Sequence, residues 1–157
     1  MTADQKNKQN TDAVHIELTD ELRAIRRELH RHPERSFKEF NTSKYLRSLL
    51  EAHGITILPD PMETGLVAQI EGAHDGPQIG LRADIDGLPI HEDSGLPFPS
   101  DNEGVMPGCG HDPHMTRLLG TDFWPADHRD PINGTTRLIF QPDDELGHGA
   151  TAANATG

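Results

Sequence analysis

The sequence predicts a mixed α/β domain in which helices and a sheet are arranged in layers. Two observations support this class: two amphipathic helical segments come first, and four short apolar segments separated by Gly, Pro, Asp and Asn follow them. A further helix is expected after His114, and the chain has no internal repeat. Helices followed by strands in this way are typical of a layered domain. At 157 residues the chain is long enough for about one such domain with its own core.

The first helix is predicted from apolar residues that recur at steps of three and four until Pro33 ends the pattern. These residues are Leu18, Leu22, Ile25 and Leu29, and either Thr19 or Asp20 can cap the helix. The second helix is predicted over residues 36–53, with Gly54 in the position where helices stop. Residues 1–15 are polar and are predicted to form a disordered tail, so the domain is expected to span residues 16–157.

Four apolar segments are predicted to be strands because turn residues bound each of them. They cover residues 55–58, 65–70, 78–83 and 135–140. The last strand follows a stretch, residues 120–134, that is expected to contain most of a helix. We expect Pro125 and Pro131 to interrupt that helix, because proline lacks the backbone N–H that a helix interior uses.

Composition excludes several classes of function. Lys and Arg total 14 against 26 Asp and Glu, and the resulting formal net charge of −12 argues against binding to nucleic acid or to an anionic membrane. No apolar run approaches the roughly 20 residues that a membrane-spanning helix needs. The single cysteine cannot form an internal disulfide, and residues 1–17 lack the apolar stretch of a signal peptide. We therefore expect a cytoplasmic protein.

Polar residues gather where the predicted strands end. Asp84 and Asp86 follow the third strand, residues 143–145 follow the fourth, and the sequence GCGHDPH at 108–114 opens the next helix. Because ligands of open α/β sheets bind outside the carboxyl ends of the strands, we expect these clusters to share one site. Together they offer thiolate, imidazole and carboxylate, which is the ligand set of a borderline transition metal such as zinc, manganese, cobalt or nickel.

Each cluster also has an alternative interpretation. A lone cysteine is more often a small buried hydrophobe than a ligand, but the glycines beside Cys109 and the nearby His111 favour a metal site. The acidic residues 143–145 are a solvated turn in the alternative interpretation, although they follow a strand directly. A calcium loop starting at Asp84 is excluded because its later ligand positions fall on Leu88 and Gly95.

Three stretches of the chain occur in the order of a known family. They read RRELHRHPERSF at 26–37, LRADIDGLPIHEDSGLPFPSDNEGVMPGCGHDPH at 81–114 and NGTTRLIFQPDDELGHGA at 133–150. Together they resemble the metal-dependent amidohydrolases that include hippurate hydrolase and the indole-acetyl amino acid hydrolases. The resemblance implies a zinc-peptidase-like layered αβα catalytic domain and two divalent metals per complete site, manganese or zinc. It also implies hydrolysis of the amide bond of a small N-acylated amino acid.

The resemblance also implies roles for individual residues. Cys109 and His111 match two metal ligands, and Glu145 matches a carboxylate ligand. Asp144 stands at the position of the catalytic base, where the family normally has glutamate. The shorter side chain has to shift by about an ångström to reach the same water, which costs of order a hundredfold in rate. Asp86 matches an acidic residue that supports the site from behind, and we count it with Asp144 as catalytic.

Other parts of the matching motifs carry weaker expectations. His114 fits the motif as a supporting residue or a substrate contact, whereas His30 and His32 are interpreted as features of a helix end. The family supplies two further histidine ligands and an inserted dimerisation domain from sequence beyond the position of Gly157. We therefore expect the N-terminal portion of a catalytic domain with the dimerisation domain absent, and we make no prediction of oligomeric state.

Three hypotheses of function remain open at this point. The first is a metal-dependent amidohydrolase, active when its site is complete. The second is a cysteine hydrolase that uses Cys109 with His111 or His114. The third is a metal-binding fragment without catalytic activity.

Overall fold

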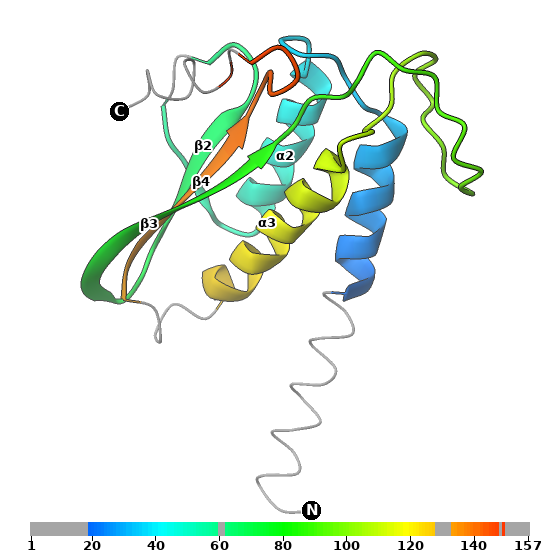
Figure 1. Ribbon diagram of the computed structural model, residues 1–157. Coiled ribbons are helices and arrows are strands. Elements are labelled where there is room, and N and C mark those ends of the chain that lie inside the picture. The colour runs from blue at the N-terminus through cyan, green and yellow to red at the C-terminus, as the bar shows by residue number, and fades with distance from the viewer. Residues whose placement is uncertain (1–18, 60–61, 128–132, 148, 150–157) are drawn as a thin grey trace, which may run out of the picture.

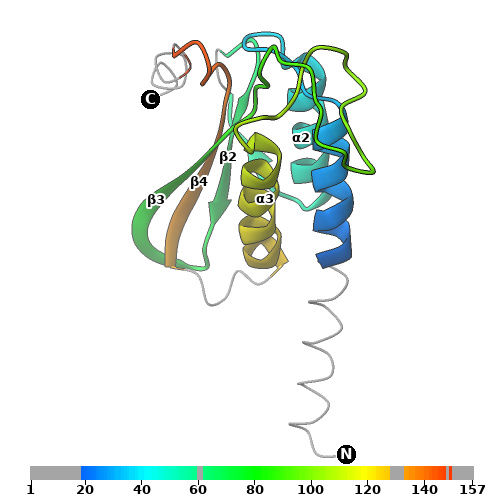
Figure 2. The same ribbon diagram turned by 45° about the vertical axis from the view of Figure 1, so that its right-hand side comes forward.

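The computed structural model describes residues 19–59, 62–127, 133–147 and 149, shown in colour in Figure 1. The described helices cover residues 19–31, Phe40–Ala52 (α2) and His111–Asp127 (α3). The strands are β1 (Thr56–Ile57), β2 (Leu66–Glu71), β3 (His74–Asp84) and β4 (Asn133–Gln141). Figure 2 shows the three helices together on one side of the sheet. The layered α/β class is therefore confirmed, and the tail predicted for residues 1–15 lies outside the described residues.

The two N-terminal helices follow the predicted pattern, with one correction. Helix 19–31 ends just before Pro33, as expected, and Gly54 follows α2 with a left-handed φ of 65°. The second helix begins at Phe40 rather than at residue 36. Residues 35–39 are not helical because Arg35 pairs with Gly87 in an isolated bridge and Phe37 has a φ of 57°.

The four predicted strands form one sheet in the order β1-β2-β4-β3. β2 pairs antiparallel with both β1 and β4, whereas β3 and β4 are parallel. In that parallel pair Leu81 lies opposite Leu138, and Asp84 lies opposite Gln141. The acidic segments after β3 and β4 consequently leave the sheet at the same edge, as the sequence predicts.

The core lies between the helices and the sheet. Apolar side chains in and directly after the helices and strands are at most 2% exposed there: Leu46, Leu50, Leu66, Ile70, Ile85, Leu119, Phe123, Leu138 and Phe140. Burying each of these side chains contributes about 1.5–3 kcal/mol. The core therefore holds α3, and with it the start of that helix at His111, against the strands.

The third helix begins earlier and continues further than expected. α3 starts at His111, before the predicted start after His114, and runs through Pro125 to Asp127. The expected interruption at Pro125 is wrong, because α3 continues through this residue to Asp127. Pro131 lies outside the described residues. Among the described residues no helix is long and apolar enough to cross a membrane.

Candidate metal centre

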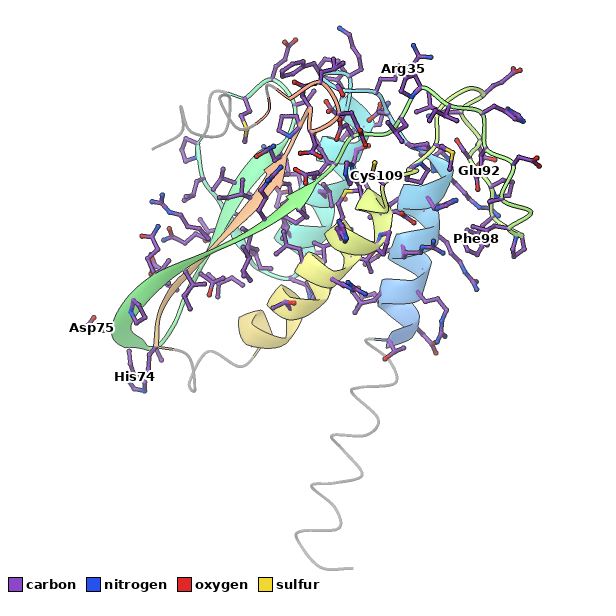
Figure 3. The ribbon with its side chains drawn as sticks, viewed as in Figure 1. Arg35, His74, Asp75, Glu92, Phe98 and Cys109 are labelled. Carbon is purple, nitrogen blue, oxygen red and sulfur yellow. The ribbon has the colours of Figure 1, made fainter. Side chains whose placement is uncertain are left out.

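Three segments that are distant in the sequence meet at the carboxyl edge of the sheet. β3 leads into Asp84 and Asp86, β4 leads into the acidic turn of residues 143–147, and α3 opens with the sequence around Cys109. Figure 3 shows Cys109 at the start of α3, next to the end of β3. The parallel register of β3 and β4, together with the packing of α3, accounts for this convergence.

Two groups of side chains at this edge have ligand atoms within 4.8 Å of one another. The first group is Cys109, His111 and Glu145, which are the three residues proposed from the sequence as ligands. The second is Asp84, His111 and Asp144. His111 belongs to both groups and is buried, while Cys109 and Asp144 are exposed. The structure thus brings the proposed ligands together, and their roles stay predictions.

Asp86 orients the ring of His111. The Nδ1–H of His111 donates to the backbone oxygen of Asp86 over 2.8 Å, and Asp86 Oδ1 lies 3.3 Å from the same nitrogen. This arrangement leaves Nε2 of His111 to face the site, 3.8 Å from Asp144 Oδ2. Burial alone lowers the pKa of His111, but the hydrogen bonds and charge of Asp86 outweigh it and raise the pKa to about 9.

The carboxylate of Asp86 is itself held in place. It is 2% exposed, and Oδ2 accepts hydrogen bonds from Ser36 Oγ at 2.7 Å and from the backbone N–H of Glu145 at 3.0 Å. Burial alone raises the pKa of Asp86, but the bonds from His111, Ser36 and Glu145 lower it to about 2. Asp86 therefore contacts the proposed ligands from behind and acts on the site through them.

A second buried carboxylate holds the acidic turn. Oε1 of Glu39 accepts a hydrogen bond from the backbone N–H of Asp143 over 3.0 Å, and both side chains are 0% exposed. Asp143 has a left-handed φ of 56°, an uncommon conformation for a residue other than glycine. Burial is the main cause of the raised pKa of Glu39. Glu39 and Asp86 together hold the backbone on both sides of Asp144.

Asp144, the proposed base, is paired with an arginine. Arg82 Nη2 donates to Asp144 Oδ1 over 2.9 Å and also to Asp84 Oδ1. The side chains of Arg82 and Asp144 are 46% and 43% exposed, so the pair contributes little to stability. The pair orients the carboxylate of Asp144. Because Arg82 binds Oδ1, Oδ2 is the oxygen that lies on the side of His111.

The donor set fits a divalent transition metal. Oε1 of Glu145 is buried and has no hydrogen-bond partner within the described residues, so it is an acceptor that lacks a donor or a cation. A hydrogen bond to Glu145, then burial, then the negative charges of Glu145, Asp144 and Asp86 raise the pKa of Cys109 to about 11. A divalent cation would give Oε1 of Glu145 a partner and would lower the pKa of Cys109, because it takes carboxylate oxygen and thiolate sulfur as ligands.

The same electrostatics disfavour the hypothesis of a cysteine nucleophile. Cysteine hydrolases need a thiolate whose pKa is lowered by an adjacent base. Around Cys109 the pKa shift has the opposite direction, and Nδ1 of His111 is engaged by Asp86. The ring of His114 lies 6.3 Å from that of His111, centroid to centroid, so it flanks the site.

Sequence reasoning assigned no individual role to three residues of this site. Asp84 was placed in the shared polar cluster but was not singled out as a ligand, although it is the last residue of β3. Arg82 could be inferred only from its position in the same strand, because residues two apart in a strand, such as Arg82 and Asp84, point to the same face of the sheet. Glu39 carried none, because its partner Asp143 is 104 residues away in the sequence.

The fold and the site define the chain as an α/β domain with a group of candidate metal ligands at the carboxyl edge of its sheet. Comparison with known proteins names the family: residues 80–156 match the description "Peptidase family M20/M25/M40". The chain is similar to this family over these residues, and the family resemblance indicated by the sequence is confirmed.

Relatives of known name agree with this assignment. N-acetyl-L-cysteine deacetylase of Bacillus subtilis is 45% identical over 145 residues, which are 92% of this chain and 35% of the relative. N-acyl-L-amino acid amidohydrolase of Geobacillus stearothermophilus is 41% identical over 133 residues, covering 82% of this chain and 36% of the relative. The chain thus spans about a third of the length of these curated relatives.

A solved structure supports the fold in the same way. The crystal structure of a Bacillus subtilis dinuclear metal-binding peptidase of the M20 family superimposes with a TM-score of 0.87 at 45% identity. The match covers 89% of this chain and 39% of that one. The described residues therefore have the fold of part of an M20 peptidase catalytic domain.

Proposed function

We propose that this chain carries part of the active site of a metal-dependent amidohydrolase that cleaves the amide bond of N-acylated amino acids. The observation that carries the proposal is the group formed by Cys109, His111 and Glu145, whose ligand atoms lie within 4.8 Å of one another. The names of the relatives, N-acetyl-L-cysteine deacetylase and N-acyl-L-amino acid amidohydrolase, support this substrate class.

The proposed roles follow from the positions of the side chains. Cys109 Sγ, His111 Nε2 and the Glu145 carboxylate would hold the metal, which would supply a water molecule of lowered pKa and polarise the amide carbonyl. Asp144 accepts the proton of that water on a carboxylate oxygen and passes it to the leaving nitrogen. Asp86 keeps Nδ1 of His111 protonated, so that Nε2 is available as the ligand atom.

We propose zinc or manganese as the metal, with two ions in the complete site. Thiolate and imidazole ligands suit zinc, and the carboxylates of Asp84, Asp144 and Glu145 suit manganese as well. The second group, Asp84, His111 and Asp144, supplies further oxygen ligands at the same edge. The dinuclear character of the related peptidase supports the stoichiometry of two.

Metal content per chain tests the proposal. Wild-type protein and the variants Cys109→Ser and His111→Asn are loaded with zinc or manganese, passed through gel filtration and measured by elemental analysis. Retained metal in the wild type and its loss in both variants supports the site. His74→Asn is the matched control, because His74 lies exposed at the far end of β3 (Figure 3) and is expected to leave the metal content unchanged.

An assay of amide hydrolysis then separates the remaining hypotheses. An amidohydrolase loses turnover of an N-acyl amino acid when a chelator removes the metal, whereas a cysteine hydrolase loses it on alkylation alone. A chain that retains metal and shows no turnover is the catalytically inactive metal-binding fragment. A wild-type chain that retains no metal contradicts the proposed site.

A further inference from the structure

A long excursion of the chain connects two parts of the candidate site. This connection, residues 88–106, begins directly after Asp86 and Gly87 and ends shortly before Cys109. Leu88 and Met106 close the base of this excursion with two backbone hydrogen bonds of 2.8 and 3.0 Å. We call residues 88–106 the excursion loop. Loops of this length inside a compact domain are usually functional.

Glu92 organises the excursion loop from within. Its side chain is 4% exposed, and Oε2 accepts a hydrogen bond from the backbone N–H of Ser100 over 2.6 Å. The hydroxyl of Ser94 donates to Oε1 of the same carboxylate. Figure 3 shows Glu92 and Phe98 on this loop, beside the helix of residues 19–31. One buried carboxylate thus ties two parts of the loop together.

His30 joins this loop to the start of α3. Its Nε2 lies 3.1 Å from Glu92 Oε1, and its Nδ1 lies 2.9 Å from Asp112 Oδ2. The ring packs edge-on against Phe98 with 5.3 Å between the ring centroids. His30 is 5% exposed and lies at the end of the helix, as expected from the sequence, and both of its nitrogens have carboxylate partners.

Asp112 connects His30 to the metal group. It is 1% exposed, directly follows His111 in the first turn of α3, and forms an ion pair with Arg26, whose Nε lies 2.8 Å from Asp112 Oδ2. The orientation of this turn determines where His111 Nε2 points, because His111 and Asp112 share the backbone of that turn. A side chain that fixes Asp112 therefore acts on the geometry of the proposed ligand.

We propose that His30 is a positioning residue with two separable arms. Its Nδ1 arm fixes the first turn of α3 through Asp112 and keeps His111 in the geometry that binds metal. Its Nε2 arm fastens the excursion loop through Glu92. The first arm rests on the proposed function, since it presumes that His111 binds metal, whereas the second arm does not.

Two amide substitutions separate the arms. The side-chain N–H of Asn reproduces the Nδ1 donor of histidine, and that of Gln reproduces the Nε2 donor. His30→Asn therefore keeps the bond to Asp112, and His30→Gln keeps the bond to Glu92. The measurements on the full chain are zinc affinity by calorimetry, cleavage within residues 92–97 by a protease of broad specificity, and the unfolding temperature.

The proposal predicts opposite patterns for the two variants. His30→Gln weakens zinc binding by about tenfold or more and leaves the loop resistant to cleavage. His30→Asn binds zinc like the wild type but is cleaved in the loop several times faster. His74→Asn, at an exposed position of β3 far from the excursion loop, is the matched control and changes neither measurement.

Other outcomes overturn the proposal. Equal loss of zinc affinity in both variants, in proportion to a lower unfolding temperature, means that His30 only stabilises the fold. If zinc affinity and loop cleavage are unchanged in both variants, neither nitrogen of His30 has the proposed positioning role. If the wild type binds no zinc but His30→Asn is still cleaved faster in the loop than His30→Gln, the proposed function is wrong. The role of Nδ1 is then wrong as well, whereas the role of Nε2 is supported.

Discussion

Asp86 holds the ring of His111 through two contacts. Nδ1 of His111 donates to the backbone oxygen of Asp86 at 2.8 Å and lies 3.3 Å from the carboxylate oxygen Oδ1 of the same residue. The same carboxylate accepts the backbone N–H of Glu145 at 3.0 Å. A single buried residue therefore orients two of the three proposed ligands. The arrangement of the proposed ligands consequently depends on a side chain that belongs to neither group of candidate ligands.

We expect Asp86→Asn to weaken metal binding by about 10- to 100-fold, the usual effect of removing an outer partner of a metal ligand. The amide keeps the size of the side chain but removes the charge that fixes His111. Calorimetric titration with zinc measures the change. Asp75→Asn is the matched control, since Asp75 lies exposed at the opposite end of β3 (Figure 3). Equal affinity of both variants and the wild type contradicts the role of Asp86.

Gly65 is expected to tolerate no side chain at the edge of the sheet that carries the acidic turn. It has a φ of 83°, and an added Cβ would lie 2.6 Å from Phe140 O and 2.7 Å from Pro142 Cδ. We predict that Gly65→Ala lowers the free energy of unfolding by about 3 kcal/mol, from backbone strain and overpacking together.

Gly54→Ala separates these two causes. Gly54 also has a positive φ, 65°, but an added Cβ meets nothing within 4 Å. Its substitution is expected to lower the free energy of unfolding by about 1 kcal/mol, which is the backbone strain alone. Urea unfolding of the two variants measures the difference, and similar losses in both count against the clash with Phe140 and Pro142.

The sequence predicted the elements of the fold because each has a local signal. Pro33 and Gly54 mark helix ends, and turn residues bound the segment that becomes β4. The start of α2 was wrong because the bridge between Arg35 and Gly87 depends on tertiary structure, which local patterns do not contain. The length of α3 was underestimated because Pro125 was taken as a local helix breaker, whereas α3 continues through it and packs against the core with Leu119 and Phe123.

The proposed ligands were predictable for a different reason. Cys109 and His111 stand two positions apart in a glycine-rich turn, so residue type and spacing are visible without any structure. The residues that orient them were not predictable in the same way. The bond of His30 to Asp112 spans 82 positions in the sequence and that of Glu39 to Asp143 spans 104. Such partners are visible only when the fold brings them together.

The stability of the chain is expected to fall in acid partly through Glu92. Burial alone raises its pKa, but hydrogen bonds from Ser94, Ser100 and His30 lower it from 4.5 to about 2. The folded state therefore binds this proton less readily than the unfolded state. The stabilisation is fully present above pH 4.5 and is lost as the pH falls towards 2.

Glu92→Gln tests this dependence. The variant is expected to be less stable than the wild type by about 2 kcal/mol at neutral pH, because it loses charge-assisted hydrogen bonds. This difference shrinks as the pH falls below 4.5. Urea unfolding between pH 7 and pH 3 measures it, with Glu103→Gln, an exposed position of the same loop, as control. A difference that stays constant over this range means that the ionisation of Glu92 is not its source.

Asp144→Glu is expected to increase hydrolysis of an N-acyl amino acid. Asp144 Oδ2 lies 3.8 Å from His111 Nε2 while Arg82 holds Oδ1, so the short side chain is drawn towards β3. An added methylene extends the carboxylate by about an ångström, and a misplacement of this size costs of order a hundredfold in rate. The increase should appear in kcat rather than in KM, because the base acts in the transition state.

Asp144→Asn and Arg82→Met complete the comparison for this site. The amide cannot accept the proton, so Asp144→Asn abolishes turnover and leaves zinc affinity within a few-fold of the wild type. Arg82→Met frees Asp144 Oδ1 from its partner and is expected to change kcat while preserving the fold, because the ion pair is half exposed. Turnover that survives in Asp144→Asn excludes this residue as the base and leaves Asp84, the other carboxylate bound by Arg82, to be tested in the same way.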